Sequence, residues 1–244
     1  MGELKKLGIT PPSRNTVKNI LKRAGLEPGP NRGEGTWDEF LTRHAATLVQ
    51  CDFLNKRIWT AKGLQDVFVL VFLHVGTRRV FVTPTTTNPT EAWVRDQTRE
   101  YLQHAKAERL PIKLLFHDND SKFTRAFDQN LENEKVEVRK TAFRAPNTNA
   151  YVERFIQTIQ QECLDHFVVL GQSHFDYLVR EWLEHYHTER PHQSLDNEPL
   201  KKSKRRGRPK MHHGPIDEQI VPLTEVRCKQ RLGGLLKSYS RKAA

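Results

Sequence analysis

Apolar and polar residues follow two different periods along the chain, and each period predicts a different kind of element. Alternation with a period of two indicates a strand, and it runs through TLVQCDFL, residues 47–54. The run DVFVLVFLHVG, residues 66–76, is almost entirely apolar, β-branched and aromatic, which is typical of a buried central strand. RRVFVTPTTT, residues 78–87, follows as its expected hairpin partner, and two further strands are predicted at 112–118 and 135–141.

Helical periodicity appears between and after these strands. The predicted helices span residues 13–26, 89–108, 147–166 and 173–187. The first has Ser13 as a plausible N-cap and Gly25 as its end. The third places its apolar residues on one face, which must meet a core: Val152, Phe155, Ile156, Ile159 and Cys163. The order of three strands, helix, strand, helix, strand and helices predicts a mixed α/β sheet flanked by helices.

Charge divides the chain into three parts. Of a formal net charge of +11, residues 200–244 carry 13 Lys/Arg against 3 Asp/Glu, residues 1–35 carry 7 against 3, and the middle carries 20 against 23. We therefore expect a partial helix-turn-helix-like segment with a Pro/Gly linker at 1–35, a folded core at 36–200 and a basic tail at 201–244. Basic ends favour a polyanion partner, most simply nucleic acid, although a basic tail can also serve solubility alone.

Several classes of protein are excluded by what the chain lacks. It has no run of 18 apolar residues, so no membrane span is expected, and its first residues have no apolar signal-peptide region. Cys51, Cys163 and Cys228 are scattered and odd in number, which predicts a reducing, cytoplasmic compartment without a disulfide framework or a cysteine zinc site.

Three carboxylates stand at unusual positions in this pattern. Asp52 lies inside an otherwise apolar strand, where a carboxylate needs a partner or a metal. Asp118 ends the fourth strand, and Glu153 lies in the first turns of the following long helix. If they converge, they would suit Mg²⁺, which prefers carboxylate oxygens, and two such ions can drive phosphoryl transfer. The alternatives are a solvated helix stripe for Glu153 and a polar helix-capping turn for residues 117–120.

These residues carry a resemblance to a known family. Asp52, Asp118 and Glu153 resemble the DDE triad of integrase catalytic cores, found in retroviral integrases and bacterial insertion-sequence transposases. The segments that carry the resemblance are HDNDSKFT at 117–124, APNTNAYVERF at 145–155, HYHTERPHQSLDNEPL at 185–200 and RLGGLL at 231–236.

The resemblance implies an RNase H-like fold, a mixed five-stranded sheet with flanking helices. It implies that Asp52, Asp118 and Glu153 hold Mg²⁺ or Mn²⁺ and catalyse DNA strand transfer without a covalent enzyme–DNA intermediate. It further implies double-stranded DNA as the partner, both element ends and target, a homo-oligomer on that DNA, and a location at the bacterial nucleoid.

Some positions depart from the family pattern. Asp120 stands where many relatives have Gly, so Asp118, which directly ends the strand, is the preferred ligand, and a supporting role of Asp120 stays open. Gln157 and Gln160 stand where retroviral relatives have Lys; together with Arg154 they are expected to contact DNA by hydrogen bonds. No His/Cys zinc module precedes the core.

The tail contains a second DNA-binding candidate. KSKRRGRPK, residues 202–210, resembles an AT-hook, in which an extended Gly-Arg-Pro core enters the minor groove of A·T-rich DNA. The basic residues expected to contact DNA are Arg205, Arg206, Arg208 and Lys210. A plain polybasic linker is the open alternative. The final residues, 231–244, are expected to be weakly helical.

Three functions are compatible with these features. The first is an active DDE recombinase or transposase. The second is a non-catalytic DNA-binding remnant, because the helix at 13–26 corresponds to only the second half of a helix-turn-helix. The third is a structure-selective nuclease of the same fold. Metal-dependent joining of a DNA 3′-hydroxyl to target DNA distinguishes the first from both others.

Overall fold

The computed structural model of the chain describes residues 13–25, 37–141, 146–195, 197–201 and 223–241, and the chain divides into two compact units, 1–43 and 44–244. In the first unit, helix α2 (Arg14–Arg23) begins as predicted at Ser13, whose Oγ accepts a hydrogen bond from Thr16 N at 3.1 Å. Helix α3 (Trp37–His44) begins in this unit, with the rings of Trp37 and Phe40 stacked 5.2 Å apart.

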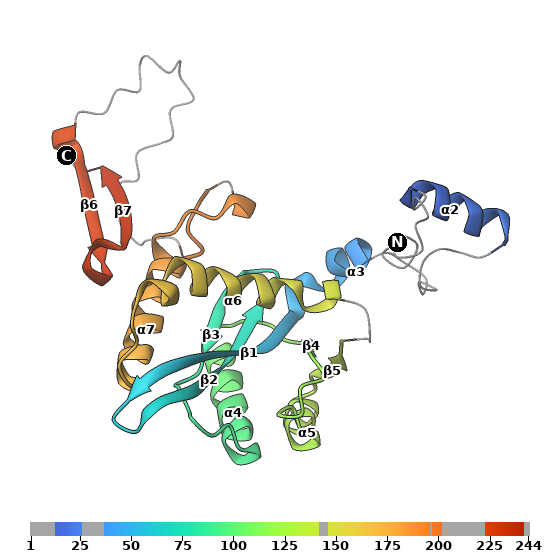
Figure 1. Cartoon of the computed structure of the whole chain (residues 1–244), viewed down its shortest axis with the longest axis horizontal. Helices are drawn as coiled ribbons and strands as arrows, with labels where there is room; N and C mark the ends of the chain where they lie inside the picture. Colours follow the sequence, from blue (N-terminus) through green and yellow to red (C-terminus); the bar gives the residue numbers. More distant parts are fainter. Residues whose placement is uncertain (1–12, 26–36, 142–145, 196, 202–222, 242–244) are drawn as a thin grey trace, which may run out of the picture. The chain divides into compact units, whose positions relative to one another are not determined.

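The second unit is built on a mixed five-stranded sheet, seen at the centre of Figure 1. Its strands are β1 (Leu48–Thr60), β2 (Gly63–His74), β3 (Val80–Val82), β4 (Leu114–His117) and β5 (Glu137–Lys140), in the order β3-β2-β1-β4-β5. The first three pair antiparallel, and β4 and β5 add to β1 in parallel. The predicted mixed sheet of an RNase H-like fold is therefore confirmed.

The sheet differs from expectation at the end of β1. We expected this strand to end near residue 54, but it continues to Thr60 and pairs with β2 as far as Gly63. Gly63 has a φ of 93°, which favours glycine, and Thr60 Oγ1 donates a hydrogen bond to Gly63 O at 2.8 Å. The sequence predicted β2 as a central strand. In the structure the central strand is β1, and β2 lies beside it.

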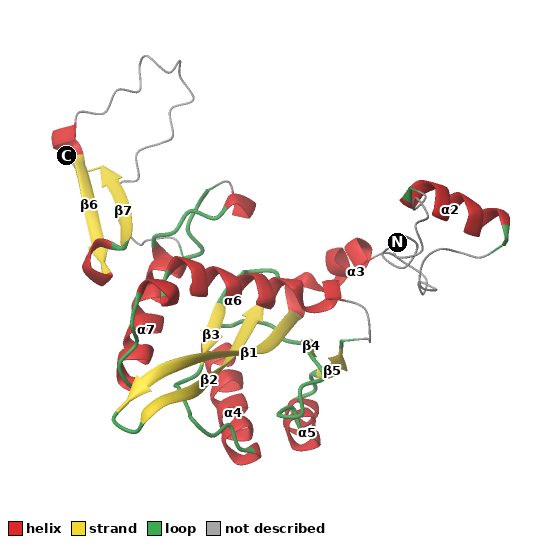
Figure 2. Ribbon diagram, in the orientation of Figure 1, coloured by secondary structure: helices red, strands yellow, loops and turns green. Residues whose placement is uncertain are grey.

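Helices cover both faces of the sheet (Figure 2). They are α4 (Glu91–Ala107), α5 (Arg125–Asn133), α6 (Ala150–Glu162) and α7 (Gln172–Thr188). Thr90 caps α4 by accepting a hydrogen bond from Trp93 N at 3.2 Å. None of the helices in the described ranges combines the length and the apolar character that crossing a membrane needs.

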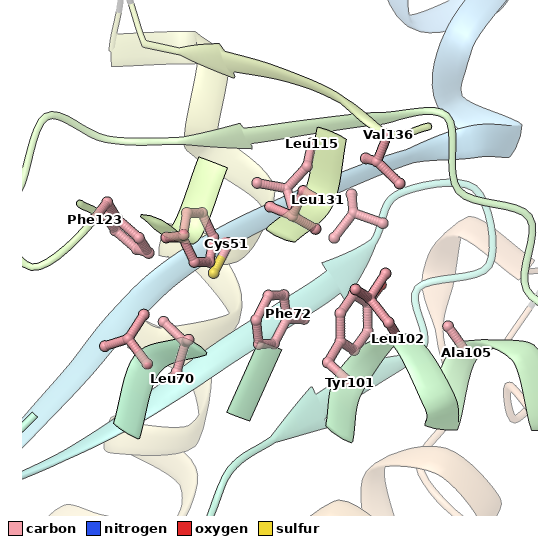
Figure 3. Packing of buried hydrophobic residues seen from close by; sticks show 13 residues of the cluster. Cys51, Leu70, Phe72, Tyr101, Leu102, Ala105, Leu115, Phe123, Leu131 and Val136 are labelled. Carbon is pink, nitrogen blue, oxygen red and sulfur yellow. The ribbon is translucent and has the colours of Figure 1, made fainter. Parts of the chain in front are cut away.

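Two apolar layers hold the helices against the sheet. On one face Cys51 and Phe72 pack under α4 and α5, with the rings of Phe72 and Tyr101 stacked 4.0 Å apart (Figure 3). On the other face α6 buries Val152, Phe155 and Ile159, and Phe155 meets Trp182 of α7 at 5.4 Å. Because α6 covers this second face, the strand residues that alternate with Cys51 point toward it.

A two-stranded hairpin follows the core near the end of the chain. Strands β6 (Val226–Arg231) and β7 (Leu236–Arg241) pair antiparallel around a turn containing Gly233 and Gly234, both at positive φ. Our expectation of a weak helix over 231–244 is wrong in the described part, because the Gly-Gly pair forms a tight turn and returns the chain as a strand.

Candidate active site

Two of the three predicted carboxylates lie at the same level of neighbouring strands, Asp52 within β1 and Asp118 directly after β4. In the parallel pair β1–β4, Cys51 is opposite His117. Asp52 directly follows Cys51, and Asp118 directly follows His117. Both carboxylate side chains are partly buried. The register of two parallel strands thus places side by side two acids that are 66 positions apart in the sequence.

Asp52 is close enough to other carboxylates for their charges to act on it. Burial, the largest effect, together with Asp118, Glu153 and Asp120, raises the pKa of Asp52 to about 7, against the opposing hydrogen bond from Phe53 N. That hydrogen bond reaches Asp52 Oδ1 at 2.7 Å. The charges of Asp118 and of Glu153, which lies in the first turn of α6, therefore both act on Asp52.

Asp120 differs from Asp118 because a cation neutralises it. Lys122 donates to Asp120 from its backbone N at 2.9 Å and from Nζ at 2.7 Å, and its ammonium group also lies 5.3 Å from the ring of Phe53. Burial alone would raise the pKa of Asp120, but these contacts with Lys122 outweigh it and lower the pKa. Asp118 Oδ1 accepts a hydrogen bond from Asp120 N at 3.0 Å, so Asp120 supports the turn that holds Asp118.

A buried histidine fixes the end of β4. The ring of His117 is fully buried, with Nδ1 2.6 Å from Asp118 O and Nε2 3.1 Å from Asp128 Oδ1. It packs between Phe123 and Phe127, at ring distances of 4.5 and 5.3 Å. These contacts restrict the backbone from which the Asp118 side chain projects.

Side-chain amides attach the first turn of α6 to β1. Gln50 Oε1 accepts hydrogen bonds from Tyr151 N at 2.9 Å and Val152 N at 3.1 Å, and its Nε2 donates to Thr148 O at 2.7 Å. Asn149 Nδ2 donates to Cys51 O at 3.1 Å. Several directional hydrogen bonds therefore join β1 to the first turn of α6, which carries Glu153.

The predicted DNA-contacting residues fall into two groups. Arg154 and Gln157 are exposed on α6 and Gln160 is partly exposed, so they can meet a ligand beside Glu153. The other four, Arg205, Arg206, Arg208 and Lys210, lie outside the described residues.

Sequence reasoning assigned no role to three polar residues of this region: Gln50, Lys122 and Asn149. Gln50 had a readable signal, because it is a polar residue two positions before Asp52 in an apolar strand and so shares its face. Asn149 stands at the expected start of a helix, where a capping residue is usual. Nothing in the sequence distinguishes Lys122 from a surface lysine.

The donor set suits a hard divalent cation in its chemistry. All the acidic groups that act on Asp52 are carboxylates, and Asn149 Oδ1 nearby is a buried oxygen without a hydrogen-bond partner within the described ranges. Among those same residues, no three His, Cys, Asp or Glu side chains are grouped closely enough to hold one metal ion. The residues thus fit such a cation by charge and donor type.

A mixed five-stranded sheet with helices on both faces, with one carboxylate within β1, one directly after β4 and one on α6, is an α/β domain that matches the RNase H-like fold. The integrase core domain family matches residues 134–199, from β5 through α7 and the turn after it. The predicted resemblance to integrase catalytic cores is therefore confirmed over this segment.

The solved structures that align with this chain include viral and transposon proteins. One chain of the simian T-cell lymphotropic virus intasome in complex with PP2A regulatory subunit B56 gamma aligns at TM-score 0.49 and 13% identity, over 80% of this chain and 66% of that one. The Mos1 mariner transposase catalytic domain aligns at 0.48 and 15%, over 60% and 76%. The HTLV-2 integrase catalytic core with magnesium, in dimeric form, aligns at 0.43 and 14%, over 59% and 87%.

This chain spans just under two thirds of the first of these structures. No curated protein matches it.

Proposed function

We propose that the chain is a DDE-type integrase or transposase that joins DNA by metal-dependent phosphoryl transfer. The proposal is supported by the strand register that sets Asp52 beside Asp118 and by the charges of Asp118 and Glu153 that act on Asp52, inside a domain whose segment 134–199 matches the integrase core family. A carboxyl group whose pKa is raised by burial and by neighbouring carboxylates, as that of Asp52 is, is characteristic of functional sites, because a fold alone gains nothing from bringing like charges together.

In this proposal Asp52, Asp118 and Glu153 hold Mg²⁺ or Mn²⁺. The bound cation supplies the positive charge that phosphoryl transfer requires at the attacking and leaving oxygens. A DNA 3′-hydroxyl forms the new bond to a target phosphorus and loses its proton, while the target's own 3′-oxygen leaves and takes up a proton. The chain forms no covalent bond to the DNA in this exchange.

The chain's other residues bind and orient the DNA. Arg154, Gln157 and Gln160 lie on the same helix as Glu153 and present donors to the phosphate backbone. Lys122 keeps Asp120 neutralised, so Asp120 does not compete for the cation. We further propose that the basic tail tethers target DNA and that the chain acts as a homo-oligomer on it.

A strand-transfer assay with the full chain tests the proposal. Labelled duplexes taken from the DNA that flanks the gene are incubated with supercoiled plasmid and Mg²⁺ or Mn²⁺, and joined products are counted. We expect joining that requires metal and that falls about a hundredfold or more in each of Asp52→Asn, Asp118→Asn and Glu153→Gln, since each removes one ligand worth several kcal/mol.

Asp120→Gly is the matched control. It removes a neighbouring carboxylate that Lys122 already neutralises, so its activity should stay within about tenfold of the wild type. A variant among the three acids that keeps wild-type activity would show that its assignment is wrong. Cleavage without joining would indicate a nuclease, and DNA binding without metal-dependent chemistry would indicate a binding remnant.

A further inference from the structure

The helix that carries Glu153 is capped by a strand instead of by its own residues. The first N–H groups of a helix have no partner within the helix, and the N-cap side chain usually accepts from them. Asn149, at the N-cap position of α6, makes no such hydrogen bond. Gln50 of β1 takes its place, because its Oε1 accepts from Tyr151 N and Val152 N.

We propose that Gln50 is a positioning residue of the active site: its carboxamide sets the spacing between Asp52 on β1 and Glu153 on α6. The inference rests on the proposed function, since it concerns the spacing of two of the proposed metal ligands. Asp52 is two residues after Gln50 on the same face of the strand, and Glu153 directly follows Val152.

Three hydrogen bonds make this contact directional. Gln50 Oε1 accepts two of these hydrogen bonds, and Gln50 Nε2 donates the third to Thr148 O at 2.7 Å. One side-chain amide thus binds both the turn before the helix and the first N–H groups within it. Gln50 is 0% exposed. A buried amide that lost these partners would leave three polar groups unsatisfied, so the helix cannot slide or rotate on β1 without a free-energy cost.

Asn149 closes the connection from the opposite side. Its Nδ2 donates to Cys51 O, a carbonyl of the strand between Gln50 and Asp52. Its exposed fraction is only 2%. The strand thus binds the helix start through one side chain of its own and one of the helix, and both contacts lie within one or two residues of Asp52.

Apolar packing alone would not fix this geometry. Val152, Phe155 and Ile159 hold α6 against the sheet, but apolar contacts are not directional and tolerate small shifts of a helix along its groove. A shift of about 1 Å is enough to lower the rate of a positioned reaction about a hundredfold. Directional amide contacts exclude such a shift at the level of the carboxylates.

The test replaces Gln50 by Met in the full chain, which keeps the size of the side chain and removes all three hydrogen bonds. Two quantities are measured: the Mn²⁺ concentration at half-saturation, by electron paramagnetic resonance of free Mn²⁺, and the hydrogen exchange of the Tyr151 and Val152 amides. We expect the Mn²⁺ midpoint to rise about 10- to 100-fold, as when outer partners of metal ligands are lost, and both amides to exchange faster.

Thr83→Val is the control for a general loss of stability. Thr83 is buried, accepts a hydrogen bond from Leu70 N at 2.9 Å and lies on the β2–β3 side of the sheet. The variant should lose stability but keep the Mn²⁺ midpoint within about twofold of the wild type, because distant sites act independently. Asn149→Ala, which removes the Asn149 amide with its contact to Cys51 O and keeps the Gln50 contacts, should raise the midpoint less than Gln50→Met and serves if that variant does not fold.

The outcomes separate the two proposals. If Gln50→Met, or Asn149→Ala in its place, leaves the Mn²⁺ midpoint where Thr83→Val leaves it, Gln50 only stabilises the fold and the positioning role is overturned. Unchanged exchange of Tyr151 and Val152 would overturn it as well. If the wild type shows no Mn²⁺ binding that Asp52→Asn removes, the proposed function itself fails. That result comes from the wild type and Asp52→Asn, whereas the positioning role is tested with the Gln50, Asn149 and Thr83 variants.

Discussion

At the scale of single residues, the acids of the site differ in whether the chain neutralises them. Lys122 neutralises Asp120 and lowers its pKa. The charged groups that shift Asp52 most are all carboxylates, and with burial they raise its pKa to about 7. The charged form of Asp52 is therefore disfavoured in the folded chain, and a cation bound there would favour it.

His187 gives a residue-scale prediction about acid stability. Its Nε2 accepts a hydrogen bond from Val80 N at 3.1 Å, which links α7 to β3. Burial, followed by the charges of Lys201 and Arg79, lowers the pKa of His187 to about 4. The folded state favours the neutral ring, so its contribution is complete above the usual histidine pKa of about 6.5 and is lost as the pH falls toward 4.

We expect His187→Gln to remove this part of the pH dependence. Between pH 7 and pH 4 the wild type should lose about 2 kcal/mol more of its unfolding free energy than the variant. Urea titrations at both pH values measure the difference, with His166→Gln, an exposed histidine, as the control. Parallel losses in wild type and His187→Gln would show that other groups cause the acid sensitivity.

At the scale of elements, one ionic cluster attaches the β6–β7 hairpin to α7. Arg231, at the end of β6, donates to Glu189 at 3.0 Å and to Glu181 at 2.8 Å. Only 14% of the Arg231 side chain and 10% of the Glu189 side chain are exposed. Burial would raise the pKa of Glu189, but Arg231, Lys229 and His185 outweigh it and lower the pKa to about 2.

Breaking this cluster should release the hairpin without unfolding the core. In Glu189→Gln, Arg231 loses its charged partner in a mostly buried place, at a cost of about 1–3 kcal/mol. Hydrogen exchange of residues 226–241 should become faster, while exchange in β1 and β2 stays unchanged. Lys237→Gln removes a positive charge from an exposed position of the same hairpin and should leave exchange as in the wild type. If both variants behave alike, the cluster does not hold the hairpin.

At the scale of the whole molecule, charge is separated along the chain. A slightly acidic middle part lies between two basic ends, and the last 45 residues alone account for ten of the eleven net positive charges. For a proposed enzyme of DNA, this distribution assigns chemistry to the core and general DNA attraction to the ends.

The tail segment 202–210 distinguishes two kinds of DNA attraction. If it acts as an AT-hook, the full chain should bind A·T duplexes more tightly than G·C duplexes, and replacing Arg206 and Arg208 by Ala should remove the preference. Titrations of both duplexes at one fixed salt concentration measure this, because phosphate contacts alone vary strongly with salt. Equal affinities of the wild type for both duplexes would leave only a plain basic linker.

The sequence by itself determined the kinds and order of the core elements. The apolar periods around Cys51 and Phe155 belong to a strand and a helix that the structure contains, because a residue that must be buried repeats at the period of its own element. Short-range turn signals were less decisive: the turn at Gly63 and the Gly233–Gly234 turn were both overlooked, and with them the length of β1 and the β6–β7 hairpin.

Only the tertiary structure decided how the site is held. Asp52, Asp118 and Glu153 could be proposed from the sequence, since acids at a strand end or within an apolar run are locally conspicuous. The contacts of Gln50 with Tyr151 and Val152 join residues about a hundred positions apart. No local pattern specifies such partners, because they depend on the register of β1 with β4 and on the placement of α6 across the sheet.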